Sequence, residues 1–108
     1  RNVEGPVDRS AGSTACQAAC LPLFHERDIA MLGSDTGNDV GPAQYVKPAS
    51  PIHQVSITAM GIWILDNADL EEVAQACRQR NRWEFLISIG PLALHNTTGS
   101  PVNPMAVF

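Results

Sequence analysis

The chain has 108 residues, of which 44% are hydrophobic and 17% charged, and its formal net charge is −4 at pH 7. This length suits one domain, and the apolar fraction is typical of globular rather than disordered proteins. An acidic balance disfavours nucleic-acid binding, which normally uses a basic surface. The sequence contains neither an apolar run long enough for a membrane span nor a signal-peptide pattern. We therefore expect a cytoplasmic α/β or α+β protein without nucleic-acid or membrane partners.

The N-terminal part of the chain predicts an arm followed by short helical turns. Residues 1–12 mix charge, Gly and Pro without periodicity and are typical of an extended arm or loop. Thr14 and Gln17 have the spacing of a helix capping box. Apolar side chains then recur at helical spacing over residues 16–24, but Pro22 interrupts them. We expect a kink or two short turns here.

The middle of the chain predicts a strand, a long loop and a helix. Asp28–Leu32 is a short apolar run typical of a buried strand, and residues 33–51 are rich in Gly, Pro and Asp, as loops are. Residues 54–59 alternate as a strand would, yet Ser50 suits an N-cap and Gly61 suits the position just past a helix end. We favour a helix over Pro51–Met60.

The last part of the chain predicts a second helix between strands. Asp69 and Glu72 have capping-box spacing before an apolar stripe, and the last turn of the predicted helix is rich in Arg. His95–Ser100 favours a turn, and the prolines in Pro101–Phe108 confine that extended tail to a sheet edge. Apolar runs predict strands at Ile62–Leu65, Trp83–Ile89 and Leu92–Leu94. The composition of Trp83–Ile89 is that of an interior strand.

Candidate metal ligands are scattered along the chain. The imidazole and carboxylate side chains that suit a divalent metal are His25, His53, His95, Asp35, Asp39 and Asp66. No two histidines have the spacing of a helical metal site, and no Cys-x-x-Cys occurs. His53 and Asp66 lie at opposite ends of the predicted helix and strand, so they can approach each other. The alternative interpretation is a capping Asp and a hydrogen-bonded surface His.

Two further clusters have both a functional and a structural interpretation. Cys16 and Cys20 lie one turn apart and could bind a soft metal, but as small apolar residues on a buried stripe they are explained by packing. In the Ser34–Asp39 loop, Asp35 and Asp39 could orient metal ligands or a substrate, although Asp, Asn and Gly are also the residues that tight turns use. Neither a nucleophile elbow nor a phosphate-binding glycine loop is present.

A family resemblance follows from a series of short segments. In chain order they are His25-Glu-Arg-Asp-Ile-Ala30, Gly33-Ser-Asp-Thr36, Pro51-Ile-His53, Met60-Gly61, Leu65-Asp-Asn-Ala-Asp-Leu70, Trp83-Glu-Phe-Leu86 and Gly99-Ser-Pro-Val-Asn-Pro104. Together they resemble the C-terminal third of a cyclase family that includes metal-dependent hydrolases such as bacterial kynurenine formamidase and isatin hydrolase. The resemblance covers about residues 12–108, and it implies an α/β mixed-sheet fold with two or three short helices over residues 13–108.

The resemblance implies that the parent protein hydrolyses a small-molecule amide, formamide or lactam with water activated on Mn or Zn. The family's principal ligand motif, His-x-Gly-Thr-His-x-Asp-x-Pro-x-His, is absent from these 108 residues. By position, His53 and Asp66 match a His and a Glu that bind a second metal in two-metal members. The catalytic residues are not identified by the match, and contacts with the substrate or with the metal ligands are implied for Ser34, Asp35 and Asp39.

The resemblance also implies homo-oligomers, since the family forms dimers or tetramers. We expect this chain to be a fragment that is inactive by itself because the principal ligand motif is missing. The alternative is a catalytically inactive remnant that serves as an interaction or oligomerisation module, because strand edges that the missing part would cover invite pairing with another chain.

Overall fold

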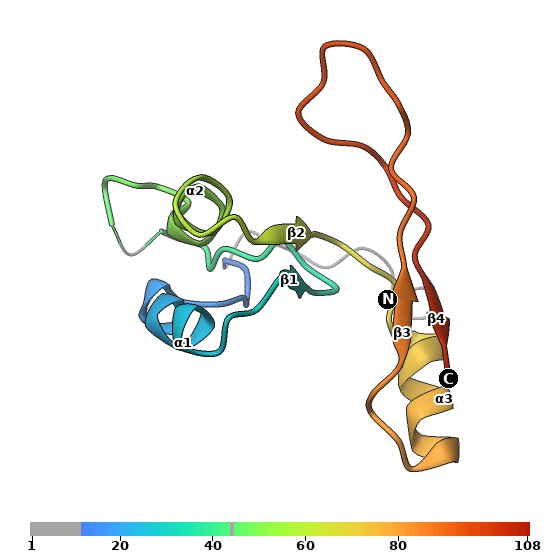
Figure 1. The fold of residues 1–108 in the computed structure, drawn as a ribbon. Coiled ribbons are helices and arrows are strands. Elements are labelled where there is room, and N and C mark those ends of the chain that lie inside the picture. The colour runs from blue at the N-terminus through green and yellow to red at the C-terminus, as the bar shows by residue number, and fades with distance from the viewer. Residues whose placement is uncertain (1–11, 44) are drawn as a thin grey trace. The chain divides into compact units, whose positions relative to one another are not determined.

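The chain divides into two compact units, one ending at Asp69 and the other comprising Leu70–Phe108. The structure, a computed structural model, describes residues 12–43 and 45–108, so the predicted arm lies outside the described residues except for its last residue. Figure 1 shows the elements, which in chain order are η1 (Ala18–Cys20, a 3-10 helix), α1 (Leu21–Glu26), β1 (Met31–Gly33), α2 (Pro51–Thr58), β2 (Trp63–Leu65), α3 (Glu71–Arg80), β3 (Leu86–Ser88) and β4 (Met105–Val107).

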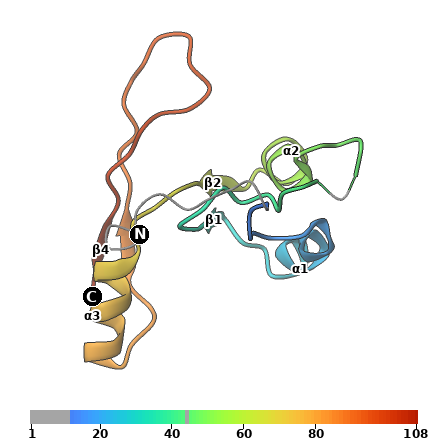
Figure 2. The same cartoon turned by 180° about the vertical axis from the view of Figure 1, so that it is seen from behind.

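The first unit is built on a pair of parallel strands connected through a helix. β1 and β2 pair with Met31 opposite Trp63 and Gly33 opposite Leu65. Parallel strands need a crossover connection, and here the long loop and α2 provide it. The two strands lie side by side in the front and rear views (Figures 1 and 2). The helix packs on β2 and also contacts α1.

The helix predicted around residues 51–60 is confirmed as α2, although the Ser50 side chain makes no capping bond. The helix was expected over Pro51–Met60 and ends two residues earlier, with Pro51 in its first turn. Gly61 follows with φ +69°, a left-handed conformation that favours glycine. Ile52 and Ile62 are 0% and 3% exposed and form the apolar core of this unit. The core is therefore small, and it lies where α2 packs on the strand that follows it.

The long loop is tied to the start of the described chain. Ser13 and Gly41 exchange both backbone hydrogen bonds, at 3.0 and 3.1 Å. Gly12 has φ +112°, and a Cβ at this position would overlap the Gly41 carbonyl oxygen. Cys16 and Asp39 form a second, parallel bridge. The loop after β1 is therefore anchored at its middle, and only glycine fits where the two segments cross.

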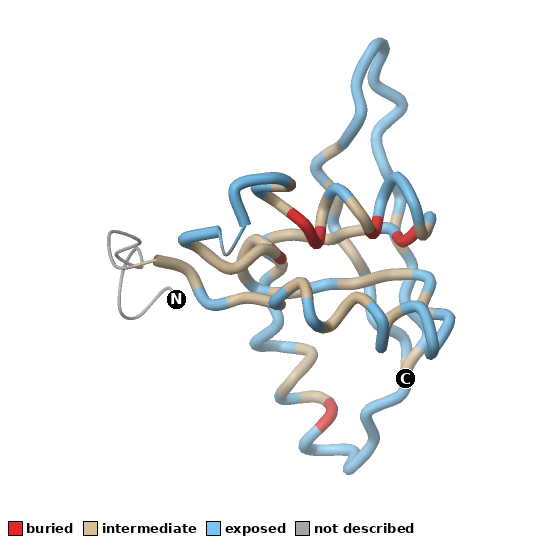
Figure 3. Tube along the Cα trace, turned by 90° about the vertical axis from the view of Figure 1, so that its left-hand side faces the viewer, coloured by how far each residue is buried: buried red, intermediate tan, exposed pale blue. Residues whose placement is uncertain are grey.

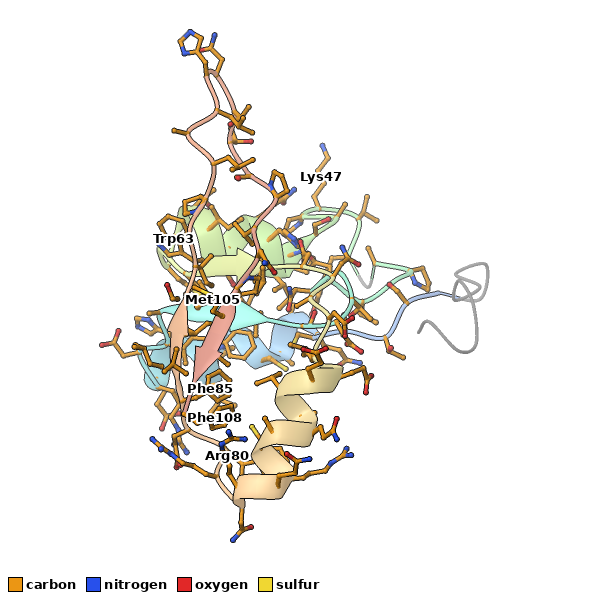
Figure 4. The ribbon with its side chains drawn as sticks, turned by 90° about the vertical axis from the view of Figure 1, so that its right-hand side faces the viewer. Lys47, Trp63, Arg80, Phe85, Met105 and Phe108 are labelled. Atoms are coloured by element: carbon orange, nitrogen blue, oxygen red, sulfur yellow. The ribbon has the colours of Figure 1, made fainter. Side chains whose placement is uncertain are left out.

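The second unit consists of α3 and an antiparallel ribbon. In the ribbon, β3 pairs with β4, with Leu86 opposite Val107. Phe85 and Phe108 stack next to this pair with ring centroids 5.2 Å apart, and the Arg80 guanidinium lies 4.9 Å from the Phe108 ring centroid (Figure 4). A cation over an aromatic face is attractive. This contact connects the end of α3 to one face of the ribbon.

Two expectations for the N-terminal half need correction in detail. The helical stripe forms two short pieces, η1 and α1, with Pro22 in the first turn of α1, as the expected interruption requires. The predicted capping box does not form, because Gln17 is itself the N-cap residue and makes no side-chain capping bond. The Thr14 carbonyl instead accepts a hydrogen bond from the Thr36 hydroxyl. The strand predicted over Asp28–Leu32 begins later, at Met31.

In the C-terminal half, the prediction of an interior strand is wrong. Trp83–Ile89 contributes only β3, and all three of its residues are exposed, because the ribbon has two strands among the described residues. The predicted strand Leu92–Leu94 is also absent, since the Leu94 N–H closes a turn onto the Leu92 carbonyl. The tail does pair at an edge, as β4. The N-cap of α3 is Leu70 rather than Asp69.

The fold class is confirmed as α/β, with short helices and both parallel and antiparallel strand pairs. Fully buried positions are confined to a few short stretches (Figure 3). Among the described residues no helix has the length and apolar character to span a bilayer. Cys16, Cys20 and Cys77 are free thiols. Burial is the main cause that raises the pKa of Cys16, and the neighbouring Cys20 raises it further. This fits the packing interpretation, because a protonated thiol binds metal poorly.

Candidate functional site

The polar cluster of the first unit lies at the carboxyl end of its two strands. Ser34 directly follows β1 and Asp66 directly follows β2, and the Ser34 N–H donates to the Leu65 carbonyl at 3.1 Å. The carboxyl ends of parallel strands meet at the same sheet edge, which is where ligands bind in open α/β sheets. The loop after β1 and the first turn of α2 bring further polar side chains to this edge.

His53 and Asp66 meet at this edge, as their places at opposite ends of the predicted helix and strand suggested. His53 lies in the first turn of α2, and its ring Nε2 is 2.7 Å from Asp66 Oδ2. Each side chain is 32% exposed, so the pair is reachable from solvent while its geometry is held by neighbours. Whether the pair binds a metal stays a prediction.

Asp39 holds the other side of His53 and also caps α2. Its Oδ1 accepts the Ile52 N–H at 2.8 Å, and its Oδ2 accepts the His53 N–H at 3.1 Å. The same Oδ2 lies 2.5 Å from the His53 ring Nδ1. The Asp39 side chain is only 14% exposed. Ser50 is the N-cap residue by position, but its side chain makes no capping bond. The cap of this helix therefore comes from the preceding loop.

Asn38 holds Asp66 and was not singled out by the sequence reasoning. Its backbone N–H and its side-chain Nδ2 both donate to Asp66 Oδ1, at 2.9 and 2.7 Å. Nδ2 also donates to the Leu65 carbonyl at 3.2 Å, and the residue is 1% exposed. Its Oδ1 is buried without a hydrogen-bond partner. The available signal was its position in the loop after a strand, next to a candidate carboxylate.

The hydrogen bonds in this cluster shift two ionisation equilibria. Burial alone would lower the pKa of His53, but the hydrogen bonds from its ring to Asp39 and Asp66 outweigh it and raise that pKa above 6.5. Burial alone would raise the pKa of Asp66, but hydrogen bonds from His53 and Asn38 lower it below 3.8. The arrangement thus favours an imidazolium between two carboxylates.

The remaining sequence candidates do not join this cluster. The Ser34 hydroxyl donates to the Thr36 carbonyl at 2.7 Å within its own turn. Asp35 is exposed in the same loop, and its carboxylate makes no contact with His53 or Asp66 among the described hydrogen bonds. His25 is exposed in α1, and His95 is exposed in a turn of the second unit.

The donor set fits part of a metal site. An imidazole nitrogen and a carboxylate oxygen are the ligands that Zn and similar divalent ions use, and such ligands are usually held by further hydrogen bonds, as both are here. Within residues 12–43 and 45–108, however, no group of three or more His, Cys, Asp or Glu is arranged to hold a metal. Among the described residues, His53 and Asp66 are therefore two candidate ligands, and a complete site would need at least one more.

Comparison with solved structures identifies a similar protein. A crystal structure described as that of a novel cyclase matches 90% of this chain with a TM-score of 0.76 and 30% sequence identity. The match covers 31% of that protein, so this chain spans about a third of its length. No protein-family model matches the chain, and no curated protein matches it significantly. The similarity supports the expected cyclase-type fold and does not address metal, substrate or assembly.

Proposed function

We propose that this chain is part of a cyclase-type, metal-dependent hydrolase that cleaves the C–N bond of a small formamide, lactam or related amide. The observation that carries the proposal is the meeting of His53 and Asp66 at 2.7 Å on the carboxyl edge of the parallel strands. The similarity of 90% of the chain to a protein described as a cyclase, at 30% identity, supports the cyclase-type part of the proposal. The family resemblance implies that a His and a Glu occupy these two positions in the two-metal members and bind the second metal there.

His53 Nε2 and Asp66 Oδ2 are the atoms that would bind the ion, with Mn and Zn as the expected metals. When bound, such an ion supplies Lewis acidity, which polarises an amide carbonyl and acidifies water. The remaining ligands would come from outside the described residues, because no group of three or more His, Cys, Asp or Glu among those residues is arranged to hold a metal. Asp35, exposed in the loop after β1, is the proposed contact with a polar group of the substrate.

A second candidate function is suggested by the ribbon of the second unit. Leu86, Met105 and Val107 are 69%, 61% and 54% exposed. Apolar strands with free edges favour pairing with another chain. The chain would then act as an interaction or oligomerisation module, which agrees with the homo-oligomer that the family resemblance implies. Both functions can hold together if the ribbon joins the chain to the rest of an enzyme.

The metal part of the proposal is tested by titrating the metal-free chain with ZnCl₂ while following its amide NMR spectrum. We expect the signals around His53 and Asp66 to shift in a saturable manner. His53→Ala and Asp66→Ala should each abolish the shifts, and His25→Ala, which changes an exposed histidine of the same unit, should not. Shifts that persist in His53→Ala would contradict the proposal.

The enzymatic part is tested by incubating the chain with N-formylkynurenine or isatin in the presence of Mn or Zn. The chain alone is expected to be inactive because it lacks the family's principal ligand motif. Activity should appear only after addition of a polypeptide that carries the motif, and it should be lost with a chelator or with His53→Ala. Complementation that proceeds equally well with His53→Ala would contradict the assigned role of this residue.

A further inference from the structure

We propose that the consecutive residues Asn38 and Asp39 are positioning residues that orient the two proposed metal ligands toward each other. Asn38 fixes the carboxylate of Asp66, and Asp39 fixes the ring of His53. The inference rests on the proposed function, because the orientation of His53 and Asp66 matters when the pair binds an ion. It rests on the hydrogen bonds of the described residues for its geometry.

Asp39 fixes the imidazole ring by occupying one of its two nitrogens. The carboxylate receives two backbone N–H groups of the first turn of α2 and lies 2.5 Å from Nδ1. It is thereby immobilised against the same helix that carries His53. With Nδ1 held, the rotation of the ring is set, and Nε2 is directed to the side where Asp66 lies. A carboxylate on one ring nitrogen also increases the basicity of the other toward a metal.

Asn38 fixes Asp66 in a matching way. The backbone N–H and the side-chain Nδ2 of Asn38 both donate to Oδ1 of Asp66. Oδ2 of Asp66 is therefore left for the contact with His53. The second hydrogen of Nδ2 goes to the Leu65 carbonyl at 3.2 Å, so the amide is tied to the last residue of β2. Because Asn38 is 1% exposed, water does not compete for these bonds.

The backbone around the two residues is itself anchored. Asp39 forms a bridge with Cys16, and its carbonyl oxygen accepts a weak bond from the Ser13 hydroxyl at 3.4 Å. Two residues later, Gly41 pairs with Ser13 through two backbone hydrogen bonds. Because Asn38 and Asp39 are adjacent in the chain, their separation is fixed by covalent geometry. Both proposed ligands are therefore held from one segment that is itself anchored by backbone hydrogen bonds.

The competing interpretation is that Asp39 is only a helix cap. A pure cap would affect the stability of α2 without affecting the ring of His53 or its affinity for a metal. The isosteric variant Asp39→Asn separates the two interpretations, because an amide has one acceptor oxygen in place of two. Asp28→Asn is the matched control: it makes the same chemical change at an exposed position of the same unit, and Asn tolerates the positive φ found there.

The experiment uses the full 108-residue chain labelled with ¹⁵N-histidine. In the metal-free protein, at a pH high enough that the His53 ring is neutral and carries one proton, we expect long-range ¹H–¹⁵N correlations to place that proton on Nδ1, and Asp39→Asn should remove or redistribute it. Titration with ZnCl₂ should show an affinity 10- to 100-fold weaker for Asp39→Asn than for the natural chain, the loss typical when the hydrogen-bond partner of a ligand is removed. Asp28→Asn should match the natural chain in both measurements.

Asn38→Ala completes the test. It should weaken zinc binding while leaving the Nδ1 proton of His53 in place, because Asn38 holds Asp66 and not the ring. The proposal is overturned if Asp39→Asn keeps both the ring signature and the zinc affinity, which is the result for a pure cap. If Asp39→Asn does not fold, the natural chain decides: a His53 ring without a proton on Nδ1 overturns the proposal. Absence of zinc binding by the natural chain contradicts the proposed function, whereas the metal-free ring signature still tests the positioning role.

Discussion

Asp39 contacts His53 twice, through the backbone N–H at 3.1 Å and through ring Nδ1 at 2.5 Å, although the two residues are 14 positions apart. One carboxylate thus both starts a helix and holds a side chain of its first turn. Negative charge at a helix N-terminus is favourable because the free N–H groups and the helix dipole converge there. The local structure of α2 and the chemistry of the site consequently depend on the same residue.

Asp39→Ala is therefore expected to lower the free energy of unfolding by about 1 kcal/mol, and by up to about 2 kcal/mol, as the loss of a side-chain cap does. Ser50→Ala should change it by less than about 0.5 kcal/mol, because the Ser50 side chain makes no capping bond. Urea denaturation followed by circular dichroism measures both values. Equal losses for the two variants would show that Asp39 does not cap the helix.

The stability of the first unit should depend on pH with a maximum in the mildly acidic range. The pKa of His53 is raised in the folded state, so its contribution is complete below about pH 6.5 and is lost as the pH rises through the folded pKa. The pKa of Asp66 is lowered, so its contribution is present above about pH 3.9 and is lost as the pH falls through the folded pKa. Both contributions coincide between about pH 4 and 6.5.

Urea denaturation at a series of pH values measures this dependence, and His53→Gln is the control. The variant should lose the decline in stability at alkaline pH, because glutamine does not titrate. An NMR titration of the His53 ring gives an independent check, with a midpoint expected above 6.5. A midpoint below that value would mean that burial outweighs the two carboxylates.

The sequence could predict those residues of the site that are placed by a local sequence pattern. His53 follows a recognisable helix start, and Asp66 follows an apolar strand. The sequence could therefore place each residue at one end of its helix or strand. Asp39 was a candidate for orienting metal ligands, but its contact with His53 could not be predicted, and Asn38 was not a candidate at all. Asn38 and Asp39 lie in a loop whose Asp, Asn and Gly content is equally typical of a simple turn. Their role arises from contacts over 13 to 28 positions, which no local pattern encodes.

The ribbon was predicted less well for a different reason. Trp83–Ile89 has the apolar composition of an interior strand. Composition indicates which environment suits a segment, but the fold decides which environment the segment has. Among the described residues, β3 has only β4 beside it, and its three residues are exposed. The sequence thus predicted a burial that the described residues do not provide. The same mismatch is why an additional polypeptide enters the proposed function.

Asn38→Asp is expected to be strongly destabilising at neutral pH. The substitution keeps the shape of the side chain, but it removes the donors to Asp66 Oδ1 and the Leu65 carbonyl and places a second carboxylate next to the first. The cost should be on the order of 3 kcal/mol, the scale for a buried charge facing a like charge. Urea denaturation at pH 7 and pH 4.5 measures it. The cost should fall at the lower pH, where one proton can be shared between the carboxylates.

Asn38→Ala provides the control for this prediction. It removes the same hydrogen bonds without adding a charge, so it should cost about 1–3 kcal/mol. Its cost should also lack the pH dependence of the Asp variant. Identical costs for the two variants at both pH values would show that charge repulsion with Asp66 is not the cause.

Gly12→Ala should weaken the anchor of the long loop. Gly12 has φ +112°, and an added Cβ would overlap the Gly41 carbonyl oxygen, so the Ser13–Gly41 pairing must open or shift. We expect a loss of more than about 1 kcal/mol, because both the backbone conformation and the space exclude a side chain. Gly37→Ala is the control, since a Cβ there meets no atom within 4 Å. Amide hydrogen exchange at Ser13 and Gly41 reports the opening directly.

The two faces of the ribbon predict how the chain associates. Residues opposite each other in an antiparallel pair share a face, so Leu86, Val107 and Met105 lie together, on the face opposite to Phe108 and its contact with Arg80. These three side chains are 54–69% exposed. Light scattering of the chain should therefore give a mass above that of a single copy, with association that strengthens with concentration.

Leu86→Lys combined with Val107→Glu should return the chain to a single copy. The two charges face each other across the ribbon and can pair, so the strands are retained while the apolar face is lost. Removing two apolar side chains from an interface costs more than about 1.4 kcal/mol, which lowers the association constant at least tenfold. The matched control is Gln75→Lys with Gln79→Glu, which adds the same charges to exposed positions of α3. Both double variants add one positive and one negative charge and leave the net charge unchanged, so a loss of association in both would assign the effect to the added charges rather than to the apolar face.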